Sequence, residues 1–296
     1  MKARLGIDLG FAVNRFPEPR EWARIVAEDL GLSHVQFVAE LLDPFLPEYF
    51  RKAQLAEIRK HTAQYGVGVD SVFTLTRTNH LMHPDPAGRA LWRKWLGDLL
   101  AMGRELGAKS GGSFFGIMTV ADHADPARRE IRVKEAVEGW QELSFLAKEL
   151  GYECLIFEPM SVPREMGCTI EEVLSLLERV NARCGVPMRL NLDVGHAAHP
   201  SQRDPYEWLA RLGSHASVVH LQQTERDRSH HWPFTPEYNA KGIIEPQRVL
   251  ETLEKAGAGE VLLAFEIGHR EHWDTEFRLI EDLKASAEYW RRWVKG

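Results

Sequence analysis

Residues 154–158 read CLIFE, 189–193 read RLNLD, 217–221 read SVVHL and 261–267 read VLLAFEI. Each is a short run rich in Val, Ile, Leu and Phe, as is typical of a parallel strand buried on both faces. Each also carries a carboxylic acid or a histidine at or next to its end. Four similar apolar runs precede them, at residues 5–9, 34–39, 68–74 and 109–115. The sequence therefore predicts eight buried strands.

Amphipathic stretches alternate with these strands, and several of them end just before a glycine. Those at 20–30, 86–106 and 126–150 are followed by Gly31, Gly107 and Gly151, and a glycine just past the last apolar position is a common helix stop. Two further helices are expected at 169–182 and 275–293.

Strict alternation of eight strands with helices predicts an α/β protein with a closed (β/α)₈ TIM barrel, formed by one domain over residues 1–296. A doubly wound open sheet is the alternative. It would usually place a glycine-rich phosphate-binding turn after the first strand, where this chain has Asp8-Leu9-Gly10-Phe11.

Composition argues against nucleic-acid-binding, secreted and membrane proteins. The net charge of -6 argues against a nucleic-acid partner, which would favour a basic face. The 3 cysteines show no CxxC spacing, which fits reduced thiols in a cytoplasmic protein. The sequence contains no secretory signal pattern and no apolar run long enough for a membrane partner. We expect a cytoplasmic protein.

Glu158, Asp193, His220 and Glu266 lie at the C-terminal ends of the last four strands. A closed barrel brings these ends around one opening, where barrel enzymes build their sites. Any one of these residues alone could equally well have a structural role: a glutamate or aspartate could pair with an arginine, and the histidine could be a hydrogen-bonded core residue. Three carboxylates together would repel one another, and buried charge is costly unless it is paired or bound to a cation. The four residues therefore predict one divalent metal ion.

The donor set also indicates which ion. Three carboxylates and one imidazole are mostly oxygen ligands, which suit Mn²⁺ or Mg²⁺, with Co²⁺ also compatible. Zn²⁺ is disfavoured because the set has no cysteine and only one histidine.

These residues resemble the xylose isomerase-like TIM barrels, specifically the branch of sugar isomerases and epimerases that includes tagatose 3-epimerase. The strand–helix order resembles the family over nearly the whole chain, whereas the specific motifs fall within residues 154–269. Those motifs are Glu158-Pro159, D193-V-G-H196, His220 with Arg226 six positions later, Gly242-Ile243 and Glu266.

The resemblance implies roles for particular residues. Glu158, Asp193, His220 and Glu266 would hold one divalent ion, and Glu158 and Glu266 would act as the acid/base pair on opposite faces of a bound sugar. His196 and Arg226 would contact substrate oxygens.

A proton on the carbon beside a carbonyl is weakly acidic, and a chelated cation stabilises the enediolate left when it is removed. One carboxylate removes the proton and a carboxyl group returns one. Return to the opposite face of the same carbon is epimerisation, and return to the neighbouring carbon is aldose–ketose isomerisation. The ligands are the same for both. We expect a metal-dependent isomerase of carbohydrate metabolism acting on a small monosaccharide, with a ketose 3-epimerase as the alternative.

The segment 224–241 contains His230-His231-Trp232-Pro233-Phe234, where the epimerases are expected to have a shorter connection. This departure favours aldose–ketose isomerisation and predicts a lid or pocket wall, with Trp232 against the sugar. His80, in the loop after the third strand, and Phe11, after the first, are further candidate substrate contacts. Both histidine-containing loops could instead have a purely structural role. The loop with His80 could cap a helix, and the segment 224–241 could simply cover the barrel mouth.

Two other classes of function use the same fold, because fold alone does not fix function. A sugar or inosose dehydratase would use the same cation to expel a β-hydroxyl. An endonuclease-like hydrolase would need further metal ligands, and the fourth strand here ends in Ser113-Phe114 without a histidine. We expect a small sugar as the partner, with Arg226 and Arg228 leaving a phosphorylated one open, and a homo-oligomer, either dimer or tetramer.

Overall fold

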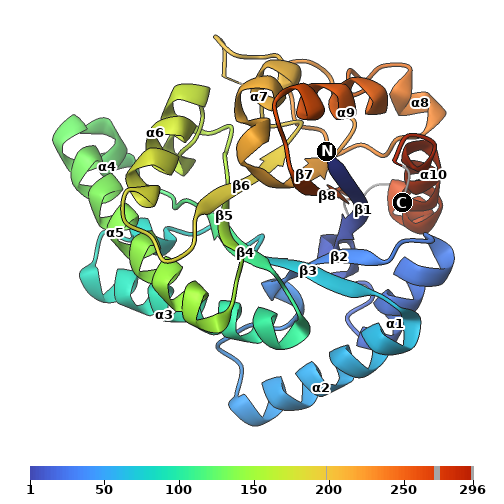
Figure 1. Cartoon of the computed structure of the whole chain (residues 1–296), viewed down its shortest axis with the longest axis horizontal. Helices are drawn as coiled ribbons and strands as arrows, with labels where there is room; N and C mark the ends of the chain where they lie inside the picture. Colours follow the sequence, from blue (N-terminus) through green and yellow to red (C-terminus); the bar gives the residue numbers. More distant parts are fainter. Residues whose placement is uncertain (198, 270–273, 295–296) are drawn as a thin grey trace.

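The computed structural model describes residues 1–197, 199–269 and 274–294. Eight parallel strands pair in chain order, and the first pairs with the last to close a barrel (Figure 1). The prediction of a (β/α)₈ TIM barrel is therefore confirmed. The strands are β1 (Lys2–Asp8), β2 (His34–Val38), β3 (Gly68–Phe73), β4 (Ser110–Phe114), β5 (Cys154–Glu158), β6 (Met188–Asp193), β7 (Ala216–Leu221) and β8 (Glu260–Phe265).

Helices surround the barrel (Figure 1). In the described part of the chain they are α1 (Pro19–Arg24), α2 (Glu48–Tyr65), α3 (Pro86–Leu106), α4 (Val120–Ala124), α5 (Pro126–Leu150), α6 (Ile170–Asn181), α7 (Pro205–Leu212), α8 (Pro236–Asn239), α9 (Pro246–Lys255) and α10 (Leu279–Arg291). None of the helices described is both long and apolar enough to span a membrane.

Local sequence signals account for the bounds of the long helices. In both α3 and α5 an aspartate caps the first turn and proline is the first residue, because proline needs no hydrogen-bond partner there. Gly107 and Gly151 end these helices at φ values of 100° and 83°, in the left-handed region that glycine adopts without strain. Both helices have the predicted bounds.

Two other predicted helices are interrupted. The stretch 20–30 forms α1 and then a π-helical turn, η2 (Ile25–Asp29). In the stretch 275–293, a 3₁₀ turn (Asp274–Arg278) precedes α10. Trp290 of α10 is fully buried and lies 5.3 Å from the ring of Phe234 and 6.5 Å from that of Phe265. Trp290 thus packs against the barrel wall, where burial of a large ring stabilises the fold, whereas Phe277 and Trp293 of the predicted stretch are exposed.

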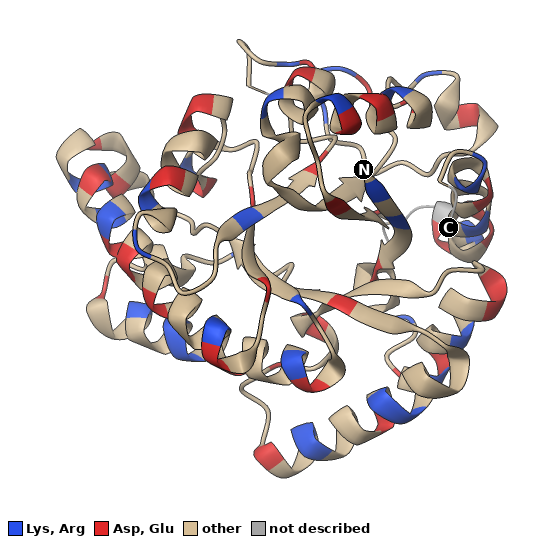
Figure 2. Cartoon of the chain, viewed as in Figure 1, with Lys and Arg blue, Asp and Glu red and all other residues tan. Residues whose placement is uncertain are grey.

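Charged residues lie mainly on the outer helices, and both signs are interspersed along them (Figure 2). The segment 224–241 is more ordered than the sequence indicates. It folds back on the residues that follow β7 through an antiparallel bridge between Gln223 and Trp232, and it contains the short helix α8.

His80 lies in a 3₁₀ turn, η4 (His80–Met82), and its side chain is fully buried. Its ring lies 4.8 Å from that of Trp92, 6.2 Å from that of Trp95 and 6.4 Å from that of Phe114. Within the described residues neither imidazole nitrogen has a hydrogen-bond partner. Burial in this aromatic setting lowers the pKa of His80 to about 4. His80 is therefore a neutral packing residue.

Protonation of His80 should make stability depend on pH. Between pH 6.5 and about 4 the unfolded chain binds a proton here that the folded chain excludes, so stability falls as the pH falls. Between pH 7 and pH 5 this loss is about 2 kcal/mol. Urea unfolding at the two pH values measures it. His80→Asn, which tolerates the left-handed φ of 47°, should lose that part of the pH dependence. An unchanged pH dependence in the variant would contradict the assignment.

Candidate active site

A cavity of about 480 Å³ opens at the C-terminal ends of the barrel strands. Its size is typical of a pocket for a small molecule. Loops that follow the strands form its wall, and the segment 229–232 borders it from one side. Five of the sequence-predicted site residues line it: Phe11, Glu158, His196, Trp232 and Glu266.

The four predicted metal ligands converge beside this cavity. Glu158 ends β5, Asp193 ends β6, His220 is the penultimate residue of β7, and Glu266 follows β8. One ligand atom from each lies within 4.8 Å of those of the other three. His220 is fully buried and Glu158 is nearly so. Convergence follows from the parallel register, in which Asp193 is directly opposite His220.

The hydrogen bonds of the cluster leave room for a cation. Nε2 of His220 lies 2.6 Å from Oε1 of Gln36, and because an amide oxygen only accepts, Nε2 carries the proton. Nδ1 therefore faces the carboxylates, 3.0 Å from Oε2 of Glu266 and 3.3 Å from Oε1 of Glu158. Neither of these buried oxygens has a hydrogen-bond partner in the described part of the chain. Three carboxylates, one imidazole and two unsatisfied oxygens fit a divalent ion.

Strong electrostatic coupling marks the same cluster. Burial disfavours charge on His220, but the carboxylates of Glu266 and Glu158 raise its pKa well above the ordinary value. Burial acts to raise the pKa of Glu266, but His220 and His231 hold it well below its usual range. Burial raises the pKa of Asp193. The ionised carboxylate of Glu266 thus depends on positive charge from the neighbouring histidines.

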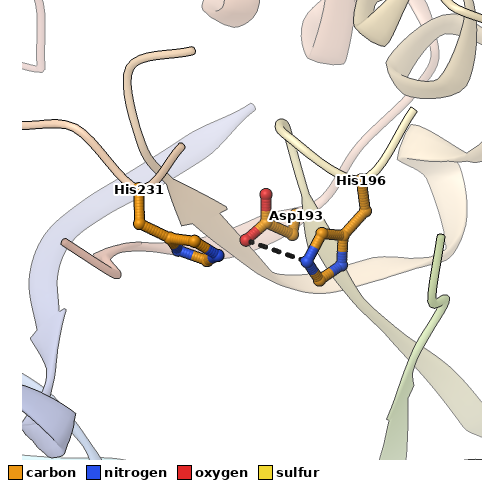
Figure 3. A group of neighbouring side chains, drawn as sticks. All are labelled: Asp193, His196 and His231. Atoms are coloured by element: carbon orange, nitrogen blue, oxygen red, sulfur yellow. Dashed lines mark ion pairs between the residues drawn. The ribbon is translucent and has the colours of Figure 1, made fainter. Parts of the chain in front are cut away.

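His196 lies in the turn after β6 and lines the cavity. Its Nδ1 is 3.2 Å from the backbone oxygen of Pro159, and its Nε2 is 3.9 Å from Oδ2 of Asp193. A second histidine, His231, approaches from the segment 224–241, so that Asp193 lies between the two imidazoles (Figure 3). The rings of His196 and His231 are 6.1 Å apart.

The aromatic wall contains Phe11 and Trp232, both predicted. Trp232 stacks on His230 with ring centroids 3.9 Å apart and an angle of 8° between the rings. Two of the predicted substrate contacts, His80 and Arg226, are not among the residues that line the cavity. His80 is buried behind Phe114, and Arg226 is exposed to solvent on the segment 224–241.

Several cavity residues were not predicted. Asp8 ends β1 and is nearly buried, and its Oδ1 accepts a hydrogen bond of 2.7 Å from the backbone of Gly10. Burial raises the pKa of Asp8 to about 8. The late strands were searched for charged residues and histidines at their C-terminal ends. The same search of the first strand would have found Asp8. His231, Arg15 and Arg77 also line the cavity, but they lie in loops, where no periodic pattern marks them.

The chain is similar to known proteins over nearly its whole length. A family model described as the xylose isomerase-like TIM barrel matches residues 25–293. D-erythrulose 1-phosphate 3-epimerase of Brucella abortus (strain 2308) is 32% identical over 297 residues, covering 98% of this chain and 96% of that protein.

Solved structures are similar over their full length. A candidate xylose isomerase from Rhodospirillum rubrum ATCC 11170 superposes with a TM-score of 0.88 at 28% identity, covering 98% of this chain and 99% of that one. D-psicose 3-epimerase of Clostridium cellulolyticum H10, solved with D-tagatose, has a TM-score of 0.76 at 15% identity, covering 99% and 100%. The second likeness shows the fold alone.

The resemblance drawn from the sequence is thereby confirmed at the level of the family. The chain belongs to the xylose isomerase-like TIM barrel family and is an enzyme of the isomerase class.

Proposed function

We propose that this enzyme is a metal-dependent 3-epimerase of a short-chain ketose phosphate. The observation that carries the proposal is the pair Glu158 and Glu266, whose carboxylates both lie beside Nδ1 of His220, at 3.3 Å and 3.0 Å. Inversion at a carbon needs one group to remove a proton and a second group to supply one from the other face. Two glutamates at the same centre provide both.

Glu158, Asp193, His220 and Glu266 would hold the ion. When bound there, a divalent cation would polarise the substrate carbonyl and stabilise the negative charge that develops as the proton leaves. One of the two glutamates removes the proton from the carbon beside the carbonyl, and the other protonates the opposite face. His196 and His231 line the same cavity, and their ring nitrogens would contact substrate oxygens. The aromatic wall of Phe11 and Trp232 excludes water from the sugar and packs against its C–H groups.

Two observations support a phosphorylated substrate. The relative that is 32% identical is named for a ketose 1-phosphate. In addition, Arg15 and Arg77 line the cavity, and arginine is the side chain that best matches phosphate geometry. These two arginines replace Arg226 and Arg228 as the candidate phosphate contacts.

Aldose–ketose isomerisation, which the sequence favours, is the second candidate. It is supported by the likeness, at 28% identity, to a structure described as a candidate xylose isomerase. It requires the proton to move to the neighbouring carbon instead of returning to the opposite face.

Turnover in D₂O distinguishes the two reactions. D-erythrulose 1-phosphate is the first probe, followed by unphosphorylated tetruloses and pentuloses, with the products read by NMR. Epimerisation places deuterium at C3 of a ketose of inverted configuration. Isomerisation to an aldose needs a free C1 hydroxyl, so its aldehyde product is sought with the unphosphorylated tetruloses and pentuloses. Loss of water from the sugar would contradict both and indicate a dehydratase.

Removing either carboxylate should abolish turnover. Glu158→Gln and Glu266→Gln should each lower kcat by roughly 10²- to 10⁴-fold, because proton transfer at carbon loses its acid or its base. Glu260→Gln, at the other end of β8, is the matched control and should behave as wild type. Near-normal activity in either site variant, on a substrate that the wild type converts, would exclude the acid/base roles.

Cation binding should stabilise the folded chain, since an ion that binds only the folded state raises the free energy of unfolding. Millimolar Mn²⁺ should raise the Tm of chelator-treated protein. The increase should be lost in Asp193→Asn, which removes one ligand charge, and kept in Asp122→Asn, which changes a buried aspartate in the first turn of α4, outside the cavity. An equal increase in wild type and Asp193→Asn would show that Mn²⁺ binds elsewhere.

A further inference from the structure

Asp193 belongs to two groups of metal-binding side chains. The first is the cluster with Glu158, His220 and Glu266, and the second joins Asp193 to His196 and His231 (Figure 3). In the second group, too, the ligand atoms lie within 4.8 Å of one another. The donor types alone would allow a second ion beside the first.

The side chain of Gln222 occupies this second group. Gln222 follows β7 and is fully buried. Its Nε2 lies 2.8 Å and 3.0 Å from the two carboxylate oxygens of Asp193, and 2.9 Å from Oγ of Ser229. The same nitrogen is 3.2 Å from Nδ1 of His231. An amide N–H₂ group therefore sits between the aspartate and the histidine.

The chemistry of its partners fixes the orientation of this amide. Oε1 of Gln222 lies 2.6 Å from the backbone nitrogen of His231, which can only donate. Nε2 faces the carboxylate of Asp193, which accepts hydrogen bonds when ionised. Exchanging the amide oxygen and nitrogen would place two acceptors together and two donors together, so the orientation follows from the hydrogen bonds.

The glycine in the D193-V-G-H196 turn leaves room for the amide of Gln222. A Cβ atom at Gly195 would lie 2.4 Å from Cδ of Gln222, closer than atoms can approach. The backbone nitrogen of Gly195 also donates to Oδ1 of Asp193. The glycine therefore lets the side chain of Gln222 lie directly against the turn that carries Asp193.

Gln222 also holds the segment over the cavity. His231 has a φ of 52°, in the left-handed region that costs energy for a residue other than glycine. This conformation is held by the bond to Gln222 and by the backbone oxygen of His231, which accepts from Gly268 at 2.9 Å. Gln222 thus connects Asp193 with the loop that presents His231.

We propose that Gln222 is a positioning residue that orients Asp193 and anchors the segment 229–231 over the cavity, and that its amide makes this a one-cation centre. The amide nitrogen presents N–H donors, which cannot bind a cation, at the position between Asp193 and His231 where a second ion would need a ligand oxygen. The inference rests on the cation of the proposed function, and it assigns a role to a residue that does not itself touch the reacting atoms.

Mn²⁺ titration of the metal-free protein, followed by calorimetry, tests this directly. Wild type should bind one ion per chain. Gln222→Leu should also bind one, with roughly 10- to 100-fold weaker affinity, because a ligand loses its outer hydrogen bonds. Gln222→Glu should bind two, since a carboxylate in place of the amide completes a second set of ligands, and the two ions should couple in the EPR spectrum.

Gln223→Leu is the matched control. Gln223 is the next residue, equally buried, and its Nε2 makes two hydrogen bonds of 3.0 Å, to Asn239 and to the backbone of Ile244. This variant should bind one Mn²⁺ with wild-type affinity. Hydrogen exchange of the amides of residues 229–231 should accelerate in Gln222→Leu more than in Gln223→Leu.

The outcomes separate this inference from the proposed function. Wild type that binds no Mn²⁺ removes the cation and with it both proposals. Wild type that binds two ions, or Gln222→Glu that binds one, overturns the role of the amide and leaves the proposed function standing. If Gln222→Glu does not fold, Gln222→Leu decides, because wild-type affinity and unchanged exchange in that variant would overturn the positioning role.

Discussion

Three carboxylates and one imidazole gathered at one end of a barrel are the constraint on which the rest of this site depends. Glu158, Asp193 and Glu266 would repel one another in a site with little water. A proton on His220, or a cation held by all four side chains, would offset that repulsion. The barrel supplies the rigidity that holds them there. Each residue lies on or directly after a different strand, and the strands are fixed by a closed ladder of hydrogen bonds.

A second layer of polar residues sets how these groups are used. Gln36 fixes the tautomer of His220 from the side of β2, and Gln222 holds Asp193 from the side of β7. Neutral amides suit this role because they orient charged groups without adding charge. Gln222 additionally reaches His231, so one buried side chain links a predicted metal ligand to the loop over the cavity.

Much of the fold was predictable from the sequence because its signals are local. Apolar runs mark the strands. An Asp-Pro pair at the beginning and a glycine at the end mark α3 and α5. The strand-end rule placed Glu158, Asp193, His220 and Glu266, since register alone brings strand ends together.

Residues in loops were less predictable, because their positions depend on tertiary contacts rather than on periodicity. His80 and Arg226 were expected at the cavity, yet one packs among aromatic rings and the other faces solvent. His231 reaches the site only because the chain folds back at the bridge between Gln223 and Trp232. Gln222 carries no motif that marks it, and its role depends on distances that the sequence does not contain.

The central claim is that one divalent ion binds between the last four strands. Anomalous diffraction from crystals grown with Mn²⁺ tests it most directly. The account predicts a single strong peak within bonding distance of Glu158, Asp193, His220 and Glu266. Density maps with no peak there, or with Mn²⁺ bound only by other residues, would contradict it.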